Sequence, residues 1–85
     1  MDKYYTGHYS EQFDGEASYG TDFYNAQPTD YEMYKANFML LAKMYGDKAK
    51  IKEYVECGYK SISIEVQVSN IAFRRSYSLK TYNGC

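Results

Sequence analysis

The supply of aliphatic side chains limits what this chain can fold into. Leu, Ile, Val and Phe together make up only 14 of the 85 residues, whereas tyrosine alone accounts for 12. A tyrosine ring can be buried, but its hydroxyl needs a hydrogen-bond partner or water, which suits half-buried positions and surfaces that meet another molecule. We therefore expect the tyrosines and the four methionines to complete a small core.

The length indicates one domain spanning residues 1–85, and a domain of this size buries only about 60–65% of the surface of its unfolded chain. Low aliphatic content leads to disorder when the net charge is also high. The net charge here is only −1, so we expect a folded domain. Because its core is small, a partner subunit in a homodimer is a second way to complete it.

The two cysteines, Cys57 and Cys85, are too few for a dense disulfide framework, and charged residues follow Met1 where a signal segment would be apolar. We therefore expect a cytoplasmic protein, in the host cell if a phage encodes it. The longest apolar run, residues 38–42, is far shorter than the roughly 18–20 residues of a membrane span. The cysteines and the single His8 also lack the number and spacing of zinc ligands, so we expect no metal, and no cofactor is predicted.

Charge is divided along the chain. Residues 1–34 hold seven acidic side chains and one lysine, a net charge of −6, whereas residues 35–85 hold nine basic and four acidic side chains, a net charge of +5. One interpretation is that the two halves attract each other within the fold. The other is an acidic, tyrosine-bearing face that meets a basic partner.

A helix is predicted from Asp30 to Tyr45. Pro28 ends the preceding segment, residues 29–32 have the form of a capping box, and Gly46 is a typical left-handed helix end. Apolar side chains recur along it at spacings of three and four, which predicts a wide face packed on two sides. The main stripe is Tyr31, Tyr34, Phe38, Leu41 and Tyr45, and the adjacent stripe is Met33, Leu40 and Met44.

A second, shorter helix is predicted from Lys48 to Cys57. Asp47 is its expected cap and Gly58 its expected end. Its apolar side chains Ile51, Tyr54 and Val55 should face inward, and Lys48, Lys50 and Lys52 outward. Only Gly46 and Asp47 separate it from the first helix. The two helices should therefore turn sharply on each other.

A β-hairpin is predicted in the C-terminal third. Residues 61–68 alternate between apolar and polar side chains, and Ser69-Asn70 has the length of a two-residue turn. This turn pairs Val68 with Ile71, Val66 with Phe73, Ile64 with Arg75, Ile62 with Tyr77, and Glu65 with Arg74 on the other face. Arg75 then lies on the apolar face, so we expect it at a sheet margin, beside a carboxylate or on a bulge.

Residues 1–27 form the least regular segment, because glycines interrupt a series of aromatic residues. A turn at Asp14-Gly15 opposes Tyr9 with Gly20 and Tyr5 with Tyr24, but neither face of such a hairpin is wholly apolar. We therefore expect a ragged hairpin or an extended arm, and a frayed tail over residues 82–85. The predicted fold class is a small single α+β domain, with two helices joined by a tight turn and packed on an antiparallel β-hairpin or sheet over residues 29–85.

Enzymatic function is the least favoured class. A nucleophile, a base and an orienting group are needed together, and the only histidine lies in the irregular first third. A pair of His8 with Cys57 is conceivable, but the predicted helix end opposes a thiolate at Cys57. No catalytic residues are predicted.

A winged-helix-like DNA-binding regulator is the alternative function, because two helices with a tight turn followed by a hairpin have the order of that motif. Against it, an isoelectric point near 5.7 lacks the usual basic footprint. The side chains available for phosphates form a secondary basic patch of Lys48, Lys50, Lys52, Arg74 and Arg75. Stacking of single-stranded nucleic acid on the N-terminal tyrosines is opposed by the acidic residues between them.

The leading hypothesis is a non-enzymatic protein that inhibits or modulates a larger macromolecular partner by covering its surface, as a phage or mobile-element anti-defence inhibitor does. The expected partner is a protein, such as a larger nucleic-acid-handling protein or complex, rather than nucleic acid itself or a membrane. The predicted contact residues are Tyr4, Tyr5, Tyr9, Asp14, Glu16, Tyr19, Asp22 and Tyr24.

One resemblance points the same way. Residues 5–9, Tyr-Thr-Gly-His-Tyr, followed by Gly15 and then a helix, look like the opening of antirestriction proteins that mimic DNA. The likeness covers about the first 46 residues and consists of common residue types. It assigns no family, and it implies an acidic surface offered to a DNA-binding protein.

Overall fold

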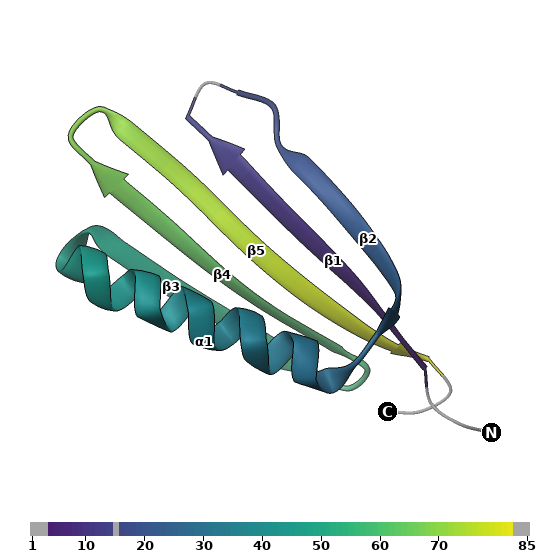
Figure 1. Ribbon diagram of the computed structural model, residues 1–85. Coiled ribbons are helices and arrows are strands. Elements are labelled where there is room, and N and C mark those ends of the chain that lie inside the picture. The colour runs from purple at the N-terminus through teal and green to yellow at the C-terminus, as the bar shows by residue number, and fades with distance from the viewer. Residues whose placement is uncertain (1–3, 15, 83–85) are drawn as a thin grey trace.

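One α-helix lies across one face of a five-stranded antiparallel sheet in the computed structural model, which describes residues 4–14 and 16–82 (Figure 1). The strand order is β2-β1-β5-β4-β3, so β5 is central and β2 and β3 are the edges. The elements are β1 (Tyr4–Phe13), β2 (Tyr19–Ala26), α1 (Pro28–Tyr45), a 3-10 turn η1 (Gly46–Lys48), β3 (Ala49–Glu56), β4 (Tyr59–Val68) and β5 (Ile71–Tyr82). The α+β class is confirmed, with one helix instead of two.

The predicted helix over residues 48–57 is wrong. These residues form the end of η1, the edge strand β3 and the start of the following turn. Residues 49–56 place Ala49 and Ile51 toward α1 and Lys50 and Lys52 away from it, which is also the alternation of a strand. Every residue from Ala49 to Glu56 pairs with the apolar strand β4, and this pairing favours the strand over the helix that the same sequence could form. The helix-turn-helix arrangement is therefore not formed.

The first helix is confirmed, but it begins earlier than predicted. Pro28 occupies its first position, where a missing N–H is tolerated, and the capping box joins Gln27 with Asp30 in place of Thr29 with Glu32. Gly46, with a φ of 63°, ends the helix. The predicted inner stripe packs on the sheet, with Tyr31 and Phe38 fully buried.

The C-terminal hairpin has the predicted register at every pair, and Ser69 takes the positive φ of 54° that its tight turn requires. Arg75 meets a carboxylate, one of its three expected environments. Its Nε lies 3.7 Å from the Glu11 Oε2 of the neighbouring strand β1, and its guanidinium lies 5.2 Å from the centre of the Phe73 ring. The charge is thus accommodated on the central strand β5.

The N-terminal segment is part of the sheet rather than an arm. Strand β1 pairs with β5 over its full length as well as with β2. The predicted pairing within this hairpin is wrong: Tyr9 opposes Thr21, and Tyr5 opposes Ala26 because the register shifts between Tyr5 and Gly7. Of the predicted frayed tail, Tyr82 ends β5, and the other three residues lie outside the described part of the chain.

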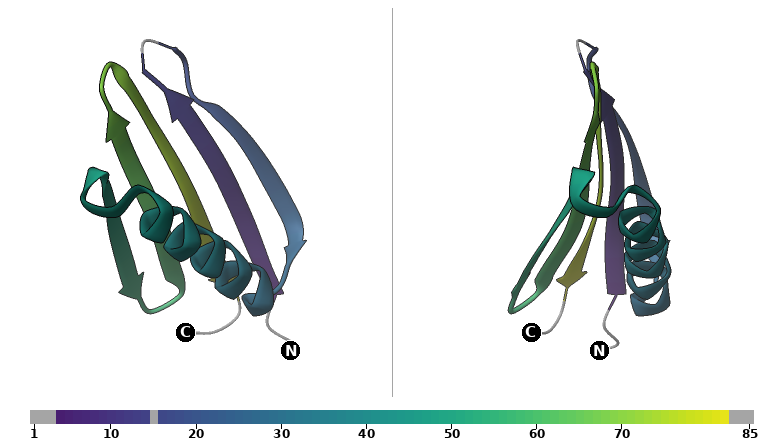
Figure 2. Two further views of the ribbon diagram at one scale, coloured as in Figure 1. Left: turned by 60° about the vertical axis from the view of Figure 1, so that its left-hand side comes forward. Right: turned by 90° about the vertical axis from the view of Figure 1, so that its left-hand side faces the viewer.

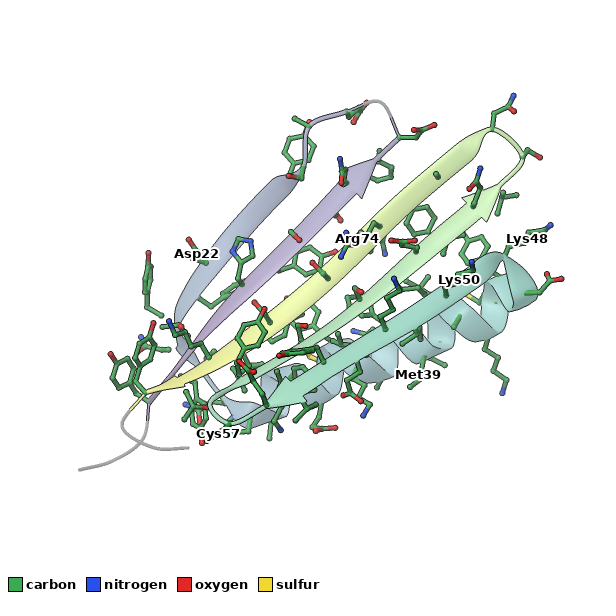
Figure 3. The ribbon with its side chains drawn as sticks, turned by 180° about the vertical axis from the view of Figure 1, so that it is seen from behind. Asp22, Met39, Lys48, Lys50, Cys57 and Arg74 are labelled. Atoms are coloured by element: carbon green, nitrogen blue, oxygen red, sulfur yellow. The ribbon has the colours of Figure 1, made fainter. Side chains whose placement is uncertain are left out.

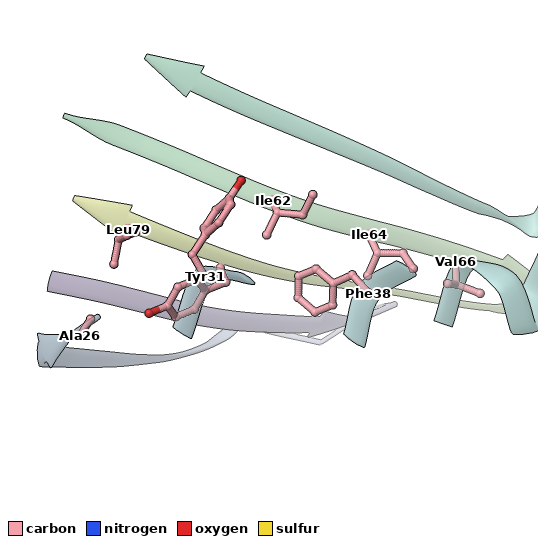
Figure 4. Packing of buried hydrophobic residues seen from close by; sticks show 8 residues of the cluster. Ala26, Tyr31, Phe38, Ile62, Ile64, Val66 and Leu79 are labelled. Carbon is pink, nitrogen blue, oxygen red and sulfur yellow. The ribbon is translucent and has the colours of Figure 1, made fainter. Parts of the chain in front are cut away.

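The core lies between α1 and the sheet (Figures 2 and 4). Tyrosine rings extend it as the composition predicts. Tyr77 stacks on Tyr34 with ring centres 4.2 Å apart, and Tyr34 also stacks on Tyr9 at 5.2 Å. The fully buried residues are Ala26, Tyr31, Phe38, Ile62, Ile64, Val66, Tyr77 and Leu79.

Alkaline pH should unfold this protein through its core tyrosines. Burial raises the pKa of Tyr77 to about 12, and burial together with the hydrogen bond to Glu11 raises the pKa of Tyr9 to about 12. Because a tyrosine in an unfolded chain ionises near pH 10, each phenol stabilises the fold below about pH 10. This contribution is lost as the pH rises toward 12.

Circular dichroism measured together with tyrosinate absorbance checks this expectation. Subtracting the titration of the Tyr9→Phe or Tyr77→Phe variant from that of the wild type isolates the ionisation of the one phenol that the variant lacks. We expect this phenol to ionise in the same pH range in which the fold is lost. Ionisation of either group near pH 10 with the fold intact would contradict it.

Candidate functional site

The face of the sheet opposite α1 is the candidate site, and we call it the open face (Figure 3). Alternate side chains of all five strands point to it, while the others point to the helix side. The molecule extends 50 × 25 × 18 Å, so this face is long and the protein is thin. The tyrosine, serine and charged side chains of the open face occupy separate zones.

The middle of the open face consists of small hydroxyl side chains. One row across the sheet runs from Ser10 through Ser76 to Ser63, and the next row includes Ser78 and Ser61. The Oγ atoms of Ser10 and Ser76 are 2.6 Å apart, within hydrogen-bond distance. This zone is flat and can donate and accept hydrogen bonds.

Tyrosines gather at the end where β1 begins and β5 ends. Tyr4 and Tyr82 are stacked with ring centres 4.7 Å apart, and Tyr54 and Tyr59 make a tilted pair at 6.2 Å. Tyr24 is 73% exposed. A shallow hollow of about 300 Å³ lies among Tyr24, Tyr59 and Tyr82, with Lys80 at its edge.

Basic side chains gather at the other end. Lys48, Lys50 and Arg74 border a second shallow hollow of about 360 Å³, together with Glu65 and Gln67. The Arg74 Nε lies 4.0 Å from a Glu65 carboxylate oxygen, and both side chains are exposed. Two carboxylates, Asp14 and Glu65, line this hollow with the three cations, so its net charge is positive but small.

His8 lies on the open face beside a carboxylate. Its Nδ1 is 2.6 Å from the Asp22 carboxylate, across the β1–β2 pair. Cys57 lies in the β3–β4 turn, so the conceived pair of His8 with Cys57 is not brought together. Across residues 4–14 and 16–82, no three His, Cys, Asp or Glu side chains are grouped as metal ligands are.

The structure does not gather the predicted contact residues on one surface. Tyr4, Asp22 and Tyr24 lie on the open face, and Asp14 and Glu16 lie at the β1–β2 turn. The remaining three, Tyr5, Tyr9 and Tyr19, point to the helix side, and the first two pack against the core. Of the three acidic contact residues, Asp22 therefore lies on the open face near Tyr24, whereas Asp14 and Glu16 lie at the turn, away from these tyrosines.

The predicted basic patch is largely on one surface. Lys48, Lys50, Lys52 and Arg74 belong to the open face, whereas Arg75 points to the helix side beside Glu11. Sequence reasoning missed Tyr54, Tyr59, Tyr82 and Lys80. The alternating serines of residues 61–63 and 76–78 were the available signal, because small polar residues in two paired strands mark a shared solvent face.

Comparisons with protein-family models, with curated proteins and with solved structures give no match to this chain. In the described part of the chain, no helix combines the length and the apolar character needed to cross a membrane.

Proposed function

We propose that this is a binding protein that covers a surface of a larger protein with its open face and thereby inhibits or modulates it. The observation that carries the proposal is the composition of this face, where five tyrosines, one from each strand, lie with five serines from β1, β4 and β5. Tyrosine supplies a large rigid contact area at low entropic cost, and serine supplies adaptable hydrogen bonds. The same pair of residue types dominates antibody binding loops.

The dimensions of the face suit such a contact. A stable protein–protein interface takes about 800 Å² from each partner, and the two longer extents of the molecule, 50 and 25 Å, enclose more than this. A sheet also holds its side chains rigidly, so little conformational entropy is lost on binding. No catalytic step is needed for inhibition by surface coverage.

Charge indicates the chemistry of the partner surface. Five cations, Lys48, Lys50, Lys52, Arg74 and Lys80, lie on the open face, against three carboxylates, Asp22, Glu56 and Glu65. The complementary surface is therefore mainly acidic, in contrast to the basic groove that the N-terminal acids predicted. The carboxylates among the cations favour a protein of mixed charge over the uniformly anionic backbone of a nucleic acid.

The test is a variant with Tyr24→Ser, Tyr54→Ser and Tyr82→Ser. Circular dichroism first shows whether the variant is folded. We expect it to be, because the rings of Tyr24 and Tyr54 are exposed and Tyr82 is the last residue of β5. Proteins captured from cells by the wild type are purified, and each is titrated with the wild type and with the variant. We expect the variant to bind at least about a hundredfold more weakly, since exposed tyrosine anchors commonly contribute 2 kcal/mol or more each.

The outcomes separate the functions. Equal binding of a purified partner by wild type and variant would contradict the open face as the site. Binding of single-stranded RNA or DNA that is lost in the tyrosine variant and falls steeply with salt would replace the protein partner by a nucleic acid.

A further inference from the structure

Exposed apolar side chains are concentrated on the helix side, the side opposite the proposed binding face. Among the described residues, every exposed large apolar side chain other than tyrosine lies on the helix side of the sheet or on α1. These residues are Phe13, Phe23, Met33, Met39, Leu40, Met44, Val55 and Ile71, and the exposed Tyr19 lies with them. Apolar patches of this extent mark contact with another molecule.

The first part of this surface is the outer face of α1. Met33, Leu40 and Met44 follow one another at spacings of seven and four, which places them along one line of the helix. They are 52%, 61% and 76% exposed, and they lie opposite the buried stripe of Tyr31 and Phe38. A helix that is apolar on two opposite faces is expected between two layers, and its own sheet supplies only one.

The second part is the uncovered half of the sheet. Helix α1 packs mainly over β3, β4 and β5, and Figures 1 and 2 show the upper part of β1 and β2 lying clear of it. On the helix side of these strands Phe13, Tyr19 and Phe23 remain 38%, 62% and 39% exposed. Such a half-covered sheet lacks the second helix that would complete its layer.

We infer that a second copy of this chain covers both parts. In a two-fold dimer, the outer face of α1 of one copy lies on the β1–β2 half of the partner's sheet, and the same contact is repeated in reverse. Both helices then form one middle layer between two sheets. Each open face stays on the outside, so the inference is independent of the proposed function.

The two surfaces are complementary in kind, because the apolar stripe of α1 meets exposed aromatic side chains of β1 and β2 that no helix of the same copy covers. The contact would involve the three exposed residues of α1 and the three exposed residues of β1 and β2 named above. With about 150–250 Å² for a large side chain, their exposed parts amount to about 600 Å² per copy. A stable interface uses about 800 Å² per partner, which these residues reach with modest flanking contacts. Low aliphatic content also fits a core that is completed by a partner subunit.

Asn37 lies between Met33 and Leu40 on the outer face of α1 and is exposed. A polar side chain in an apolar seam needs a hydrogen-bond partner there. The edge strand β2 offers unpaired backbone groups and the Thr21 hydroxyl on the proposed contact surface. A single such polar residue can fix the register of a dimer.

Sedimentation equilibrium of the wild type and of a Leu40→Glu/Met44→Glu variant tests the inference. We expect a wild-type dimer at micromolar concentrations and a dimer dissociation constant raised at least about a hundredfold in the variant, because each mutated position occurs twice in the interface. Both positions are exposed on the helix, so the variant should retain its fold. The Tyr54→Ser variant, altered on the open face, is the matched control and should dimerise like the wild type.

An isotope-filtered NOE experiment on a mixture of labelled and unlabelled wild-type protein locates the contact. We expect intermolecular NOEs between the methyl groups of Leu40 and Met44 and the rings of Phe13, Tyr19 and Phe23. A monomeric wild type, an unchanged dimer in the glutamate variant, or NOEs that place β2 edge to edge with β2 would each overturn the inference. Loss of partner binding in the open-face variant with the dimer intact separates this contact from the proposed function.

Discussion

Replacing Gly7 with alanine should destabilise the protein by about 3 kcal/mol, although the same change in a strand usually stabilises. A Cβ atom at position 7 would lie 2.3 Å from the Tyr77 hydroxyl oxygen, 2.9 Å from its ring carbon Cζ and 3.2 Å from the Ala26 Cβ. Tyr77 cannot move aside, because it is 1% exposed and stacked on Tyr34. Urea denaturation monitored by circular dichroism measures the change in free energy of unfolding.

Gly20→Ala is the matched control for this prediction. Gly20 lies on the neighbouring strand β2, and the close contact of a Cβ there would be the ring of the exposed His8, at 2.8 Å, while the Tyr9 carbonyl oxygen at 3.7 Å is an ordinary contact. Since that ring can rotate into solvent, the change in stability should stay within about 0.5 kcal/mol. In a Tyr77→Phe background the cost of Gly7→Ala should fall, because the closest clashing atom is gone. Equal effects of the two glycine substitutions would show that the ring of Tyr77 does not fix position 7.

The same glycine shows why the N-terminal third was hard to predict. In the sequence, Gly7 interrupts a series of aromatic residues and weakens a strand assignment. In the fold it makes room for a ring that lies 70 positions later in the chain and diagonally across the β1–β5 pair. A contact between residues so far apart in the sequence leaves no local pattern from which it could be predicted. The C-terminal hairpin was predictable in full because its pattern, turn and register are all local.

The segment after the first helix was mispredicted for a related reason. Lys48 to Cys57 contains good helix formers between a cap residue and a glycine, and its apolar positions fit both a short helix and a strand. What selects the strand is an available edge on β4, whose Ile62, Ile64 and Val66 face α1. Tertiary pairing therefore outweighed local preference.

The candidate site was only partly visible for a third reason. Its tyrosines and serines come from strands that are far apart in the sequence. Of the acids between the N-terminal tyrosines, Asp22 lies on the open face, whereas Glu11 points to the helix side and Asp14 and Glu16 lie at the turn. Tyr4 and Tyr24 were identified from the first third alone, whereas Tyr54, Tyr59 and Tyr82 join them only through the order of the sheet. Four of the five residues of the predicted basic patch lie on the open face, because Lys50 and Lys52 alternate along β3, Arg74 lies on the same face of β5, and Lys48 lies beside them in η1.

Replacing Tyr31 with alanine should remove about 3–5 kcal/mol, a large part of the roughly 4–13 kcal/mol expected for 85 residues. Its ring is 1% exposed and packs between α1 and the sheet, while the Lys60 Nζ lies 5.3 Å from the ring centre. Tyr24→Ala, which removes an exposed ring of the same size, is the matched control and should cost less than about 0.5 kcal/mol. Thermal unfolding of both variants gives the comparison, and similar losses would contradict a core role for Tyr31.

The Tyr31→Phe variant isolates the hydroxyl group, which donates a 2.7 Å hydrogen bond to the Glu53 Oε2 and lies 3.2 Å from the Ser61 carbonyl oxygen. We expect it to lose about 1–3 kcal/mol at neutral pH, because a carboxylate acceptor strengthens the bond. Hydrogen bonds from Tyr31 and Lys35 lower the pKa of Glu53, so this carboxylate stabilises the fold above its unfolded pKa of about 4.3. That contribution is lost as the pH falls through the lowered folded value. The difference between wild type and Tyr31→Phe should therefore shrink in denaturation experiments at about pH 3, and a difference that stays constant with pH would assign the loss to packing instead.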